Sequence, residues 1–289
     1  MTDPLAHAAT LSFWSRPVEP QPISGGITNA NFSVEHRGER YFVRIGDDID
    51  VHGVKRFNEA AASRAAFLAG LSPEVVHVEP GVLVTRFIDG RTLTSEDVRN
   101  DVPRVVDLVR RCHHGIPQHL RGPALVFWVF HVVRDYAATL REVASRFAPR
   151  LAELLAKAAT LESTVGPIDL AFGHNDLLAS NLIDDGKRLW LIDWDYAGFN
   201  SPLFDLGGLA SNNGFSLEQE HQMLEGYFDA PISDALIDRY RAMKCASLLR
   251  ETMWSMVSEH FSSIDFDYVG YSDHNFAKFE AAFQEISNG

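Results

Sequence analysis

The two stretches that decide the fold are FGHNDLLASNLI, residues 172–183, and LWLIDWD, residues 189–195. Each places acidic or amide side chains directly after a run of apolar residues, as expected where strand ends deliver polar groups into a cleft. Asp176 is followed by four residues and then Asn181, while Asp193 ends an apolar run that predicts a buried strand. The spacing therefore predicts a polar site built from Asp176, Asn181 and Asp193.

An ordinary turn followed by an Asn helix cap is the alternative explanation of Asp176 and Asn181. The apolar flanks, the preceding Gly173 and His174, and the second acidic strand end at Asp193 favour a catalytic interpretation. Phosphotransferases of the protein-kinase type use this spacing, with the Asp accepting the hydroxyl proton and the Asn and second Asp holding magnesium. Because Mg²⁺ prefers oxygen ligands, Asn181, Asp193 and nucleotide phosphates suffice as its ligands. His174 is interpreted as structural, since a base there would duplicate Asp176.

Composition narrows the class of protein. The chain has 289 residues, 46% of them hydrophobic, enough for one large domain or two lobes around a cleft. A net charge of -13 argues against nucleic acid or an anionic membrane as partner and favours a cationic ligand. The only cysteines, Cys112 and Cys245, and the lack of a signal-like start or an apolar span predict a cytoplasmic protein without membrane insertion. His113, His114 and His119 are expected on a solvated surface, not in a metal cluster.

The order of patterns predicts an α+β protein of two lobes. Residues 20–45 have hairpin composition with a turn at 37–39, residues 54–71 have helical spacing, and 75–78 and 82–88 have strand composition. After Gly90 the patterns are helical, at residues 102–112, 151–158, 217–228, 232–254 and 275–286. We therefore expect a protein-kinase-like fold: a small antiparallel-sheet N-lobe with one helix, residues 1–88, which binds nucleotide, and a larger, mainly helical C-lobe, residues 89–289, for catalysis and substrate binding.

Two features of the N-lobe fit nucleotide binding. SGGITNANF, residues 24–32, can cradle phosphate through its glycines, Thr28 and Asn29, although a simple hairpin turn explains it as well. Arg44 on the third strand and Glu59 in the first helix occupy the places of a phosphate-pairing cation and its acidic partner. The alternative for Arg44 and Glu59 is a surface ion pair of little energetic consequence.

Taken together, these motifs resemble the choline/ethanolamine kinase family, within the wider group of aminoglycoside phosphotransferase-like kinases. The resemblance covers nearly the whole chain and is carried by GGITNANF, FVRIG, the helix with Glu59, VTRFIDGRTL, GHNDLLASN, LIDWDYAGFNSPLFDLG and MWSMVSEHFSSIDFDYVGY. The resemblance implies that Asp176 is the base, Asn181 and Asp193 are the metal ligands, Arg44 contacts phosphate, and the backbone at Arg86 and Ile88 forms the adenine hinge.

The resemblance also implies a pocket for the acceptor alcohol, formed by Tyr196, Trp254, Asp265 and Tyr271. A quaternary ammonium cannot donate a hydrogen bond, so aromatic faces and a carboxylate are suited to hold it. The alternative is that Trp254 and Tyr271 are core aromatics. Glu251 stands where related eukaryotic enzymes carry a second pocket Trp, and Asn212 where they carry a Glu. The expected pocket therefore has fewer aromatic residues than in those enzymes, so ethanolamine, thiamine or another amino alcohol is an alternative to choline as the acceptor.

The sequence thus predicts an ATP- and Mg²⁺-dependent kinase that phosphorylates the hydroxyl of a cationic amino alcohol, with choline or ethanolamine as the first candidates. An aminoglycoside, thiamine or other small-molecule kinase shares the catalytic residues and differs only in the pocket. A pseudokinase that binds nucleotide without turnover is the alternative from a different class, and intact Asp176, Asn181 and Asp193 argue against it. A homodimer and the role of Asp195 stay open.

Overall fold

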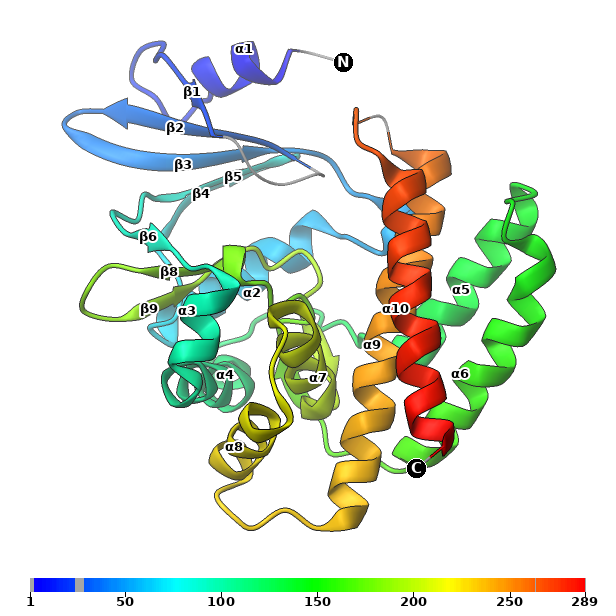
Figure 1. Cartoon of the computed structure of the whole chain (residues 1–289). Helices are drawn as coiled ribbons and strands as arrows, with labels where there is room; N and C mark the ends of the chain where they lie inside the picture. Colours follow the sequence, from blue (N-terminus) through cyan, green and yellow to red (C-terminus); the bar gives the residue numbers. More distant parts are fainter. Residues whose placement is uncertain (1–2, 24–28, 263, 289) are drawn as a thin grey trace.

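The computed structural model describes residues 3–23, 29–262 and 264–288 (Figure 1). The strands are β1 (Gln21–Pro22), β2 (Ala30–His36), β3 (Glu39–Ile45), β4 (Val75–Glu79), β5 (Val82–Arg86), β6 (Arg91–Thr92), β7 (Ala171–Gly173), β8 (Leu182–Asp184), β9 (Leu189–Leu191) and β10 (Gly198–Asn200). The α-helices are α1 (Pro4–Ala9), α2 (Arg56–Leu68), α3 (Ser95–Asn100), α4 (Val102–Gly115), α5 (Val129–Glu142), α6 (Leu151–Val165), α7 (Pro202–Asn213), α8 (Leu217–Phe228), α9 (Asp234–Phe261) and α10 (Tyr268–Asn288). Short 3₁₀ turns lie at Asp50–His52, Ile116–Gln118, Ala148–Arg150 and Ala179–Asn181.

An antiparallel sheet of five strands, in the order β1-β2-β3-β5-β4, forms the N-terminal part of the fold. The turn between β2 and β3 has positive φ angles at Arg37 (54°) and Gly38 (78°), which suits a two-residue hairpin. Alternating residues of β2 and β3 bury their side chains, and Val34 and Val43 lie in a core shared with Trp14. The predicted hairpins and the helix that follows β3 are confirmed.

The C-terminal part is built around α9, a helix of 28 residues that packs against α5, α6, α7 and α10 (Figure 1). Helices α7 and α9 approach closely because Gly207 has no side chain: a Cβ there would lie 2.7 Å from the Cα of Lys244. Prediction from the sequence recovered α4, α6, α8, α9 and part of α10 but did not identify α1, α3, α5 and α7. α7 begins with a Ser201 cap and Pro202, yet its apolar and glycine residues obscure a helical stripe.

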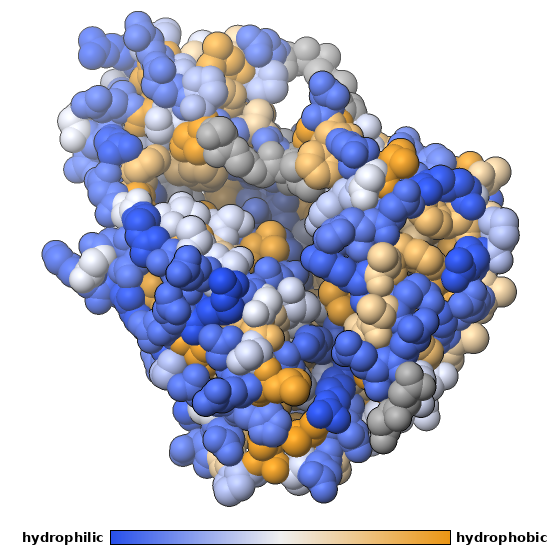
Figure 2. Space-filling model, in the orientation of Figure 1, coloured by the Kyte–Doolittle hydropathy of each residue, from blue (hydrophilic) through white to orange (hydrophobic). Residues whose placement is uncertain are grey.

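Short strand pairs bring residues 172–183 and 189–195 together between the five-stranded sheet and the helices around α9. β7 pairs with β10, with Gly173 opposite Gly198, and β8 pairs with β6 and β9. Figure 2 shows the surface hollowed between the sheet and the helices below it. Residues 87–90 carry the chain from β5 to β6; the domain division at 88/89 stays a prediction. In the described part of the chain, no helix combines the length and apolar character needed to cross a membrane.

Candidate active site

The loop that carries Asp176 follows β7 and is fixed by hydrogen bonds from behind. Asp205, at the start of α7, accepts the backbone amides of His174 and Asn175, each at 2.7 Å. Asn175 has φ 64°, a left-handed conformation that this double contact holds in place. The His174 ring is buried, packs edge-on against Trp194 and hydrogen-bonds the carbonyl of Ile192 at 2.9 Å, a structural role as expected.

Asp205 is itself held by a buried histidine. His113 of α4 contacts the Asp205 Oδ2 at 2.9 Å through Nε2 and the Tyr227 hydroxyl at 2.7 Å through Nδ1. Burial alone raises the pKa of Asp205, but hydrogen bonds from His113 and the loop amides outweigh it and lower that pKa. His113 is 1% exposed, so the expectation of a solvated surface histidine is wrong. The error arose because its partner lies 92 positions away in the sequence.

Asp176 lines a pocket together with Arg250 and Glu251 of α9. Desolvation raises the pKa of Asp176 to about 7; Arg250 opposes that shift, whereas Glu251, Asp195 and Asp205 add to it. A carboxyl group with a pKa near 7 exchanges a proton readily at neutral pH. Asp176 therefore has the location and the proton affinity of a general base.

Oxygen groups that could hold a divalent cation lie beside Asp176. The Asn181 side-chain amide donates to the Asp176 carbonyl at 2.9 Å, so its oxygen is the atom available to a metal. Asp193 has φ 68° and an exposed side chain. Desolvation by the protein atoms packed around it is the main cause that raises its pKa, and the charges of Asp195, Asp176 and Glu59 add to it. Among the described residues no three His, Cys, Asp or Glu side chains form a metal-binding group by themselves. The assignment of Asn181 and Asp193 as metal ligands stays a prediction.

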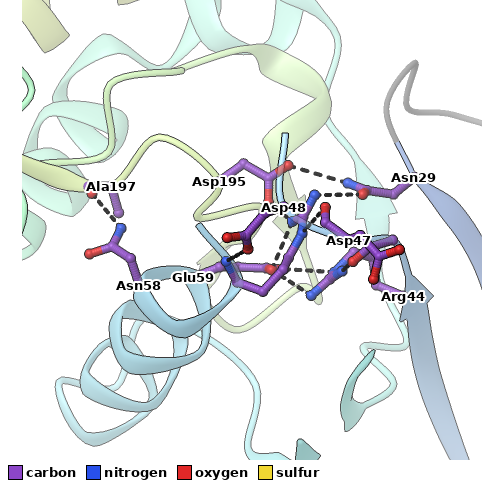
Figure 3. A network of polar contacts seen from close by, with 10 residues as sticks. Asn29, Arg44, Asp47, Asp48, Asn58, Glu59, Asp195 and Ala197 are labelled. Atoms are coloured by element: carbon purple, nitrogen blue, oxygen red, sulfur yellow. Dashed lines mark hydrogen bonds and ion pairs between the residues drawn. The ribbon is translucent and has the colours of Figure 1, made fainter. Parts of the chain in front are cut away.

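A buried ion-pair network joins β3, α2 and the loop after β9 (Figure 3). Arg44 donates to both Glu59 carboxylate oxygens, from Nε at 2.9 Å and from Nη2 at 2.5 Å, and its Nη1 donates to the Gly46 carbonyl. Both side chains of the pair are 4–5% exposed, so the surface-pair alternative does not apply. Desolvation lowers the pKa of Arg44 and raises that of Glu59. Arg44 is anchored by protein groups at each of its three nitrogens, and its contact with phosphate stays a prediction.

Arg56, which the sequence analysis did not single out, connects this pair to Asp195. Its Nη1 contacts Glu59 at 2.9 Å and Asp195 at 2.6 Å, and its Nη2 donates to the Asn29 side-chain oxygen at 2.8 Å. The Asn29 amide donates in turn to Asp195 at 3.2 Å. The i, i+3 spacing of Arg56 and Glu59 was the available signal. Asp195 is thus a partner of Arg56 and Asn29, and it links the sheet to the loop after β9.

The other predicted nucleotide contacts are only partly described. Thr28 lies outside the described residues. Arg86 ends β5, its amide bonds the Glu74 carbonyl, and the next amide, of Phe87, bonds the Arg40 carbonyl. Arg86 and Ile88 both line a second pocket, together with Phe67 and Trp190. The adenine contacts of Arg86 and Ile88 stay a prediction.

Two of the four predicted acceptor residues, Tyr196 and Trp254, contact each other, and a third, Tyr271, contacts Glu251. Trp254 donates from Nε1 to the Tyr196 hydroxyl at 2.8 Å, and the Tyr271 hydroxyl donates to Glu251 at 2.8 Å. Asp265 is exposed on the connection between α9 and α10. The sequence analysis noted Glu251 only as a departure, yet it holds one of these aromatics.

The aromatic faces of this pocket already have neighbours. The His52 ring stacks on Trp254 with centroids 5.0 Å apart, and Trp254 is 5% exposed. The Arg250 guanidinium carbon lies 4.3 Å from the centroid of the Tyr196 ring. The pocket is therefore not an open aromatic cage, because a guanidinium and an imidazole cover these two rings.

Known proteins resemble this chain in sequence. Residues 19–243 match the phosphotransferase enzyme family, APH. Protein LicA of Haemophilus influenzae is 30% identical over 210 residues, which cover 70% of this chain and 61% of LicA. Ethanolamine kinase 2 of Mus musculus is 24% identical, covering 93% of this chain and 77% of that protein.

A crystal structure gives the same result for the fold. A choline/ethanolamine kinase family protein of Mesorhizobium loti superposes with a TM-score of 0.79 at 30% identity, covering 98% of this chain and 95% of that one. This likeness confirms the predicted two-lobed, protein-kinase-like α+β fold. The chain therefore belongs to the phosphotransferase enzyme family and, within it, to the choline/ethanolamine kinase family.

Proposed function

We propose that the protein is an ATP- and Mg²⁺-dependent kinase that phosphorylates the hydroxyl of a small cationic amino alcohol, with choline and ethanolamine as the first candidates. One observation carries the proposal: the Asp176 carboxylate lines the pocket on a loop fixed by Asp205, with Asn181 beside it. The family relationship supports the same reaction class. We place the activity in the cytoplasm and keep a homodimer as an untested prediction.

Asp176 performs the proton chemistry in this proposal. Its carboxylate accepts the proton of the acceptor hydroxyl as the oxygen bonds to the transferred phosphoryl group. The paired hydrogen bonds from Asp205 keep the loop in one conformation, so the base does not need to reorganise during the reaction. The raised pKa of Asp176 matches this role near neutral pH.

The residues present suit magnesium and a nucleotide. The Asn181 oxygen and the Asp193 carboxylate are hard oxygen donors, and the concentration of carboxylates around Asp193 attracts a divalent cation. When bound, Mg²⁺ offsets the negative charge of the nucleotide phosphates. Arg44, Glu59 and Arg56 hold β3, α2 and Asp195 in register around that site.

The acceptor side carries acidic groups. Asp176 and Glu251 line the pocket, and Glu251 also accepts a hydrogen bond from the Tyr271 hydroxyl. Carboxylates attract an ammonium group, which supports a cationic acceptor. The net charge of -13 favours the approach of such a molecule.

A coupled assay of ADP release tests the proposal with choline, ethanolamine, thiamine and a panel of aminoglycosides. We expect Mg²⁺-dependent turnover of an amino alcohol, reduced roughly 100-fold or more in Asp176→Asn with the circular dichroism spectrum retained. Asp238→Asn, at an exposed position of α9, is the matched control and should keep its activity. The absence of turnover with every amino alcohol refutes the substrate class. Near-normal activity of Asp176→Asn refutes the assignment of the base.

A further inference from the structure

Arg250 is a buried cation in the pocket that the proposed reaction leaves without a role. It lies on α9, is 4% exposed, and lines the pocket beside Asp176 and Glu251. The guanidinium lies over the ring of Tyr196, 4.3 Å from the centroid, and 5.7 Å from that of Phe127. Contact with these two aromatic rings limits how the guanidinium plane can rotate, so its N–H donors keep a fixed orientation.

One edge of this guanidinium is unoccupied. Nη1 donates to the Glu251 carboxylate at 3.0 Å. Nε and Nη2 are buried, and no atom of the described residues accepts a hydrogen bond from either. A buried, unpaired donor on a charged group is costly, and native proteins rarely keep one without a ligand or water. Nε and Nη2 together form the planar fork that binds two oxygens of one anion.

Arg44 of the same chain shows what this edge binds. Its Nε and Nη2 hold the two oxygens of the Glu59 carboxylate at 2.9 and 2.5 Å. Arg250 presents the same two atoms, but Glu251 binds Nη1, and no carboxylate among the described residues bonds to Nε or Nη2. The fork of Arg250 is thus complete as a donor pair and lacks only its acceptor.

The charge of Arg250 persists despite its burial. Desolvation disfavours the charged form, but the surrounding groups, Glu251 and Asp176 among them, raise the pKa of Arg250 above its ordinary value. Because these carboxylates repel anions, we expect Nε and Nη2 of Arg250 to bind free anions only weakly. The fork suits an oxyanion that the reaction itself brings to Asp176.

We propose that the Nε–Nη2 edge of Arg250 is an oxyanion-binding site in the acceptor pocket. Two sources share this chemistry: the phosphoryl oxygens of the phosphorylated product, or a carboxylate carried by the acceptor. The phosphoryl source rests on the proposed function, because the oxygen that faces Asp176 before transfer carries the phosphate afterwards. Arg250 and Asp176 line the same pocket and interact electrostatically, so the guanidinium lies near the place where the proposed transfer forms the phosphate.

Titration calorimetry on the full chain separates the two sources. The probes are ethanolamine, phosphoethanolamine, which adds a phosphate, and serine, which adds a carboxylate to the same amino alcohol. The proteins are the wild type, Arg250→Gln, Arg250→Lys, which keeps the charge but loses the fork, and the control Arg241→Gln at an exposed position of α9. Inorganic phosphate is titrated as a further probe that does not depend on the acceptor class.

If the phosphoryl group is the ligand, Arg250→Gln weakens phosphoethanolamine binding about tenfold or more relative to ethanolamine, and Arg250→Lys recovers only part of this loss. If an acceptor carboxylate is the ligand, the same relative loss appears with serine instead. Unchanged ratios for both probes, with unchanged phosphate binding, overturn the proposal. Arg250→Lys provides the comparison if Arg250→Gln does not fold. Failure of the proposed kinase function appears separately, as missing turnover in the ADP assay.

Discussion

The pH dependence of turnover gives the sharpest test of Asp176 as the base. Its pKa of about 7 predicts an acidic limb in kcat/KM, since the base must be ionised to accept a proton. With that midpoint, the ionised fraction is roughly one tenth at pH 6 and roughly nine tenths at pH 8. Between these values kcat/KM should therefore rise by close to an order of magnitude. Desolvation is the main cause, so the limb should persist at high salt.

Two substitutions on α9 should move this limb in opposite directions. Glu251 raises the pKa of Asp176 and Arg250 lowers it, while Asp195 and Asp205 remain unchanged in both variants. Glu251→Gln therefore moves the midpoint to lower pH, and Arg250→Gln moves it to higher pH. The assay is kcat/KM for the amino alcohol from pH 5.5 to 9, with Asp238→Asn as control. A midpoint near that of an ordinary aspartate, or shifts of the same sign in both variants, refutes the reasoning.

Three further predictions concern stability. Glu59→Ala leaves Arg44 buried without its carboxylate and should lower the free energy of unfolding by about 3–5 kcal/mol in urea titrations; a loss below about 0.5 kcal/mol contradicts the pairing. Gly207→Ala should cost about 1–3 kcal/mol, because its Cβ meets the α9 backbone at 2.7 Å, whereas Gly208→Ala, with 4.0 Å of space, should not destabilise. Burial lowers the pKa of His52 from its ordinary value of 6.5 to about 3, so below pH 6.5 the unfolded chain binds a proton that the folded chain does not, and the free energy of unfolding falls. His52→Asn should therefore lose less stability than the wild type between pH 7 and 5 in urea titrations.

The fold could be predicted where its signals are local. The β2–β3 hairpin follows from alternating apolar residues and a Gly turn, and α4 and α8 follow from apolar stripes and caps. α7 could not be found in this way because its burial comes from tertiary packing against α9, which removes the contrast between an apolar and a polar face. The order of the five strands likewise depends on pairings between residues far apart in the sequence.

The predicted catalytic set could be named from the sequence by itself. Asp176 and Asn181 lie five positions apart on one loop, where the structure joins them by a hydrogen bond, and Asp193 follows the neighbouring strand. The pairing of Arg44 with Glu59 was also accessible, because a strand and the next helix of a sheet domain pack together. These residues predict phosphoryl transfer without reference to distant contacts.

Only the tertiary structure decided what surrounds that set. The Arg56–Asp195 and His113–Asp205 contacts join residues 139 and 92 positions apart, and no sequence period encodes them. The free edge of Arg250 could be found only in the structure, because the sequence shows an arginine but not which of its N–H donors already have acceptors. Spacing along the chain determines which groups meet locally, whereas burial and hydrogen-bond partners are set by packing between α9, β10 and the catalytic loop. The residues proposed for phosphoryl transfer could therefore be predicted from the sequence, whereas the contacts of the acceptor pocket could not.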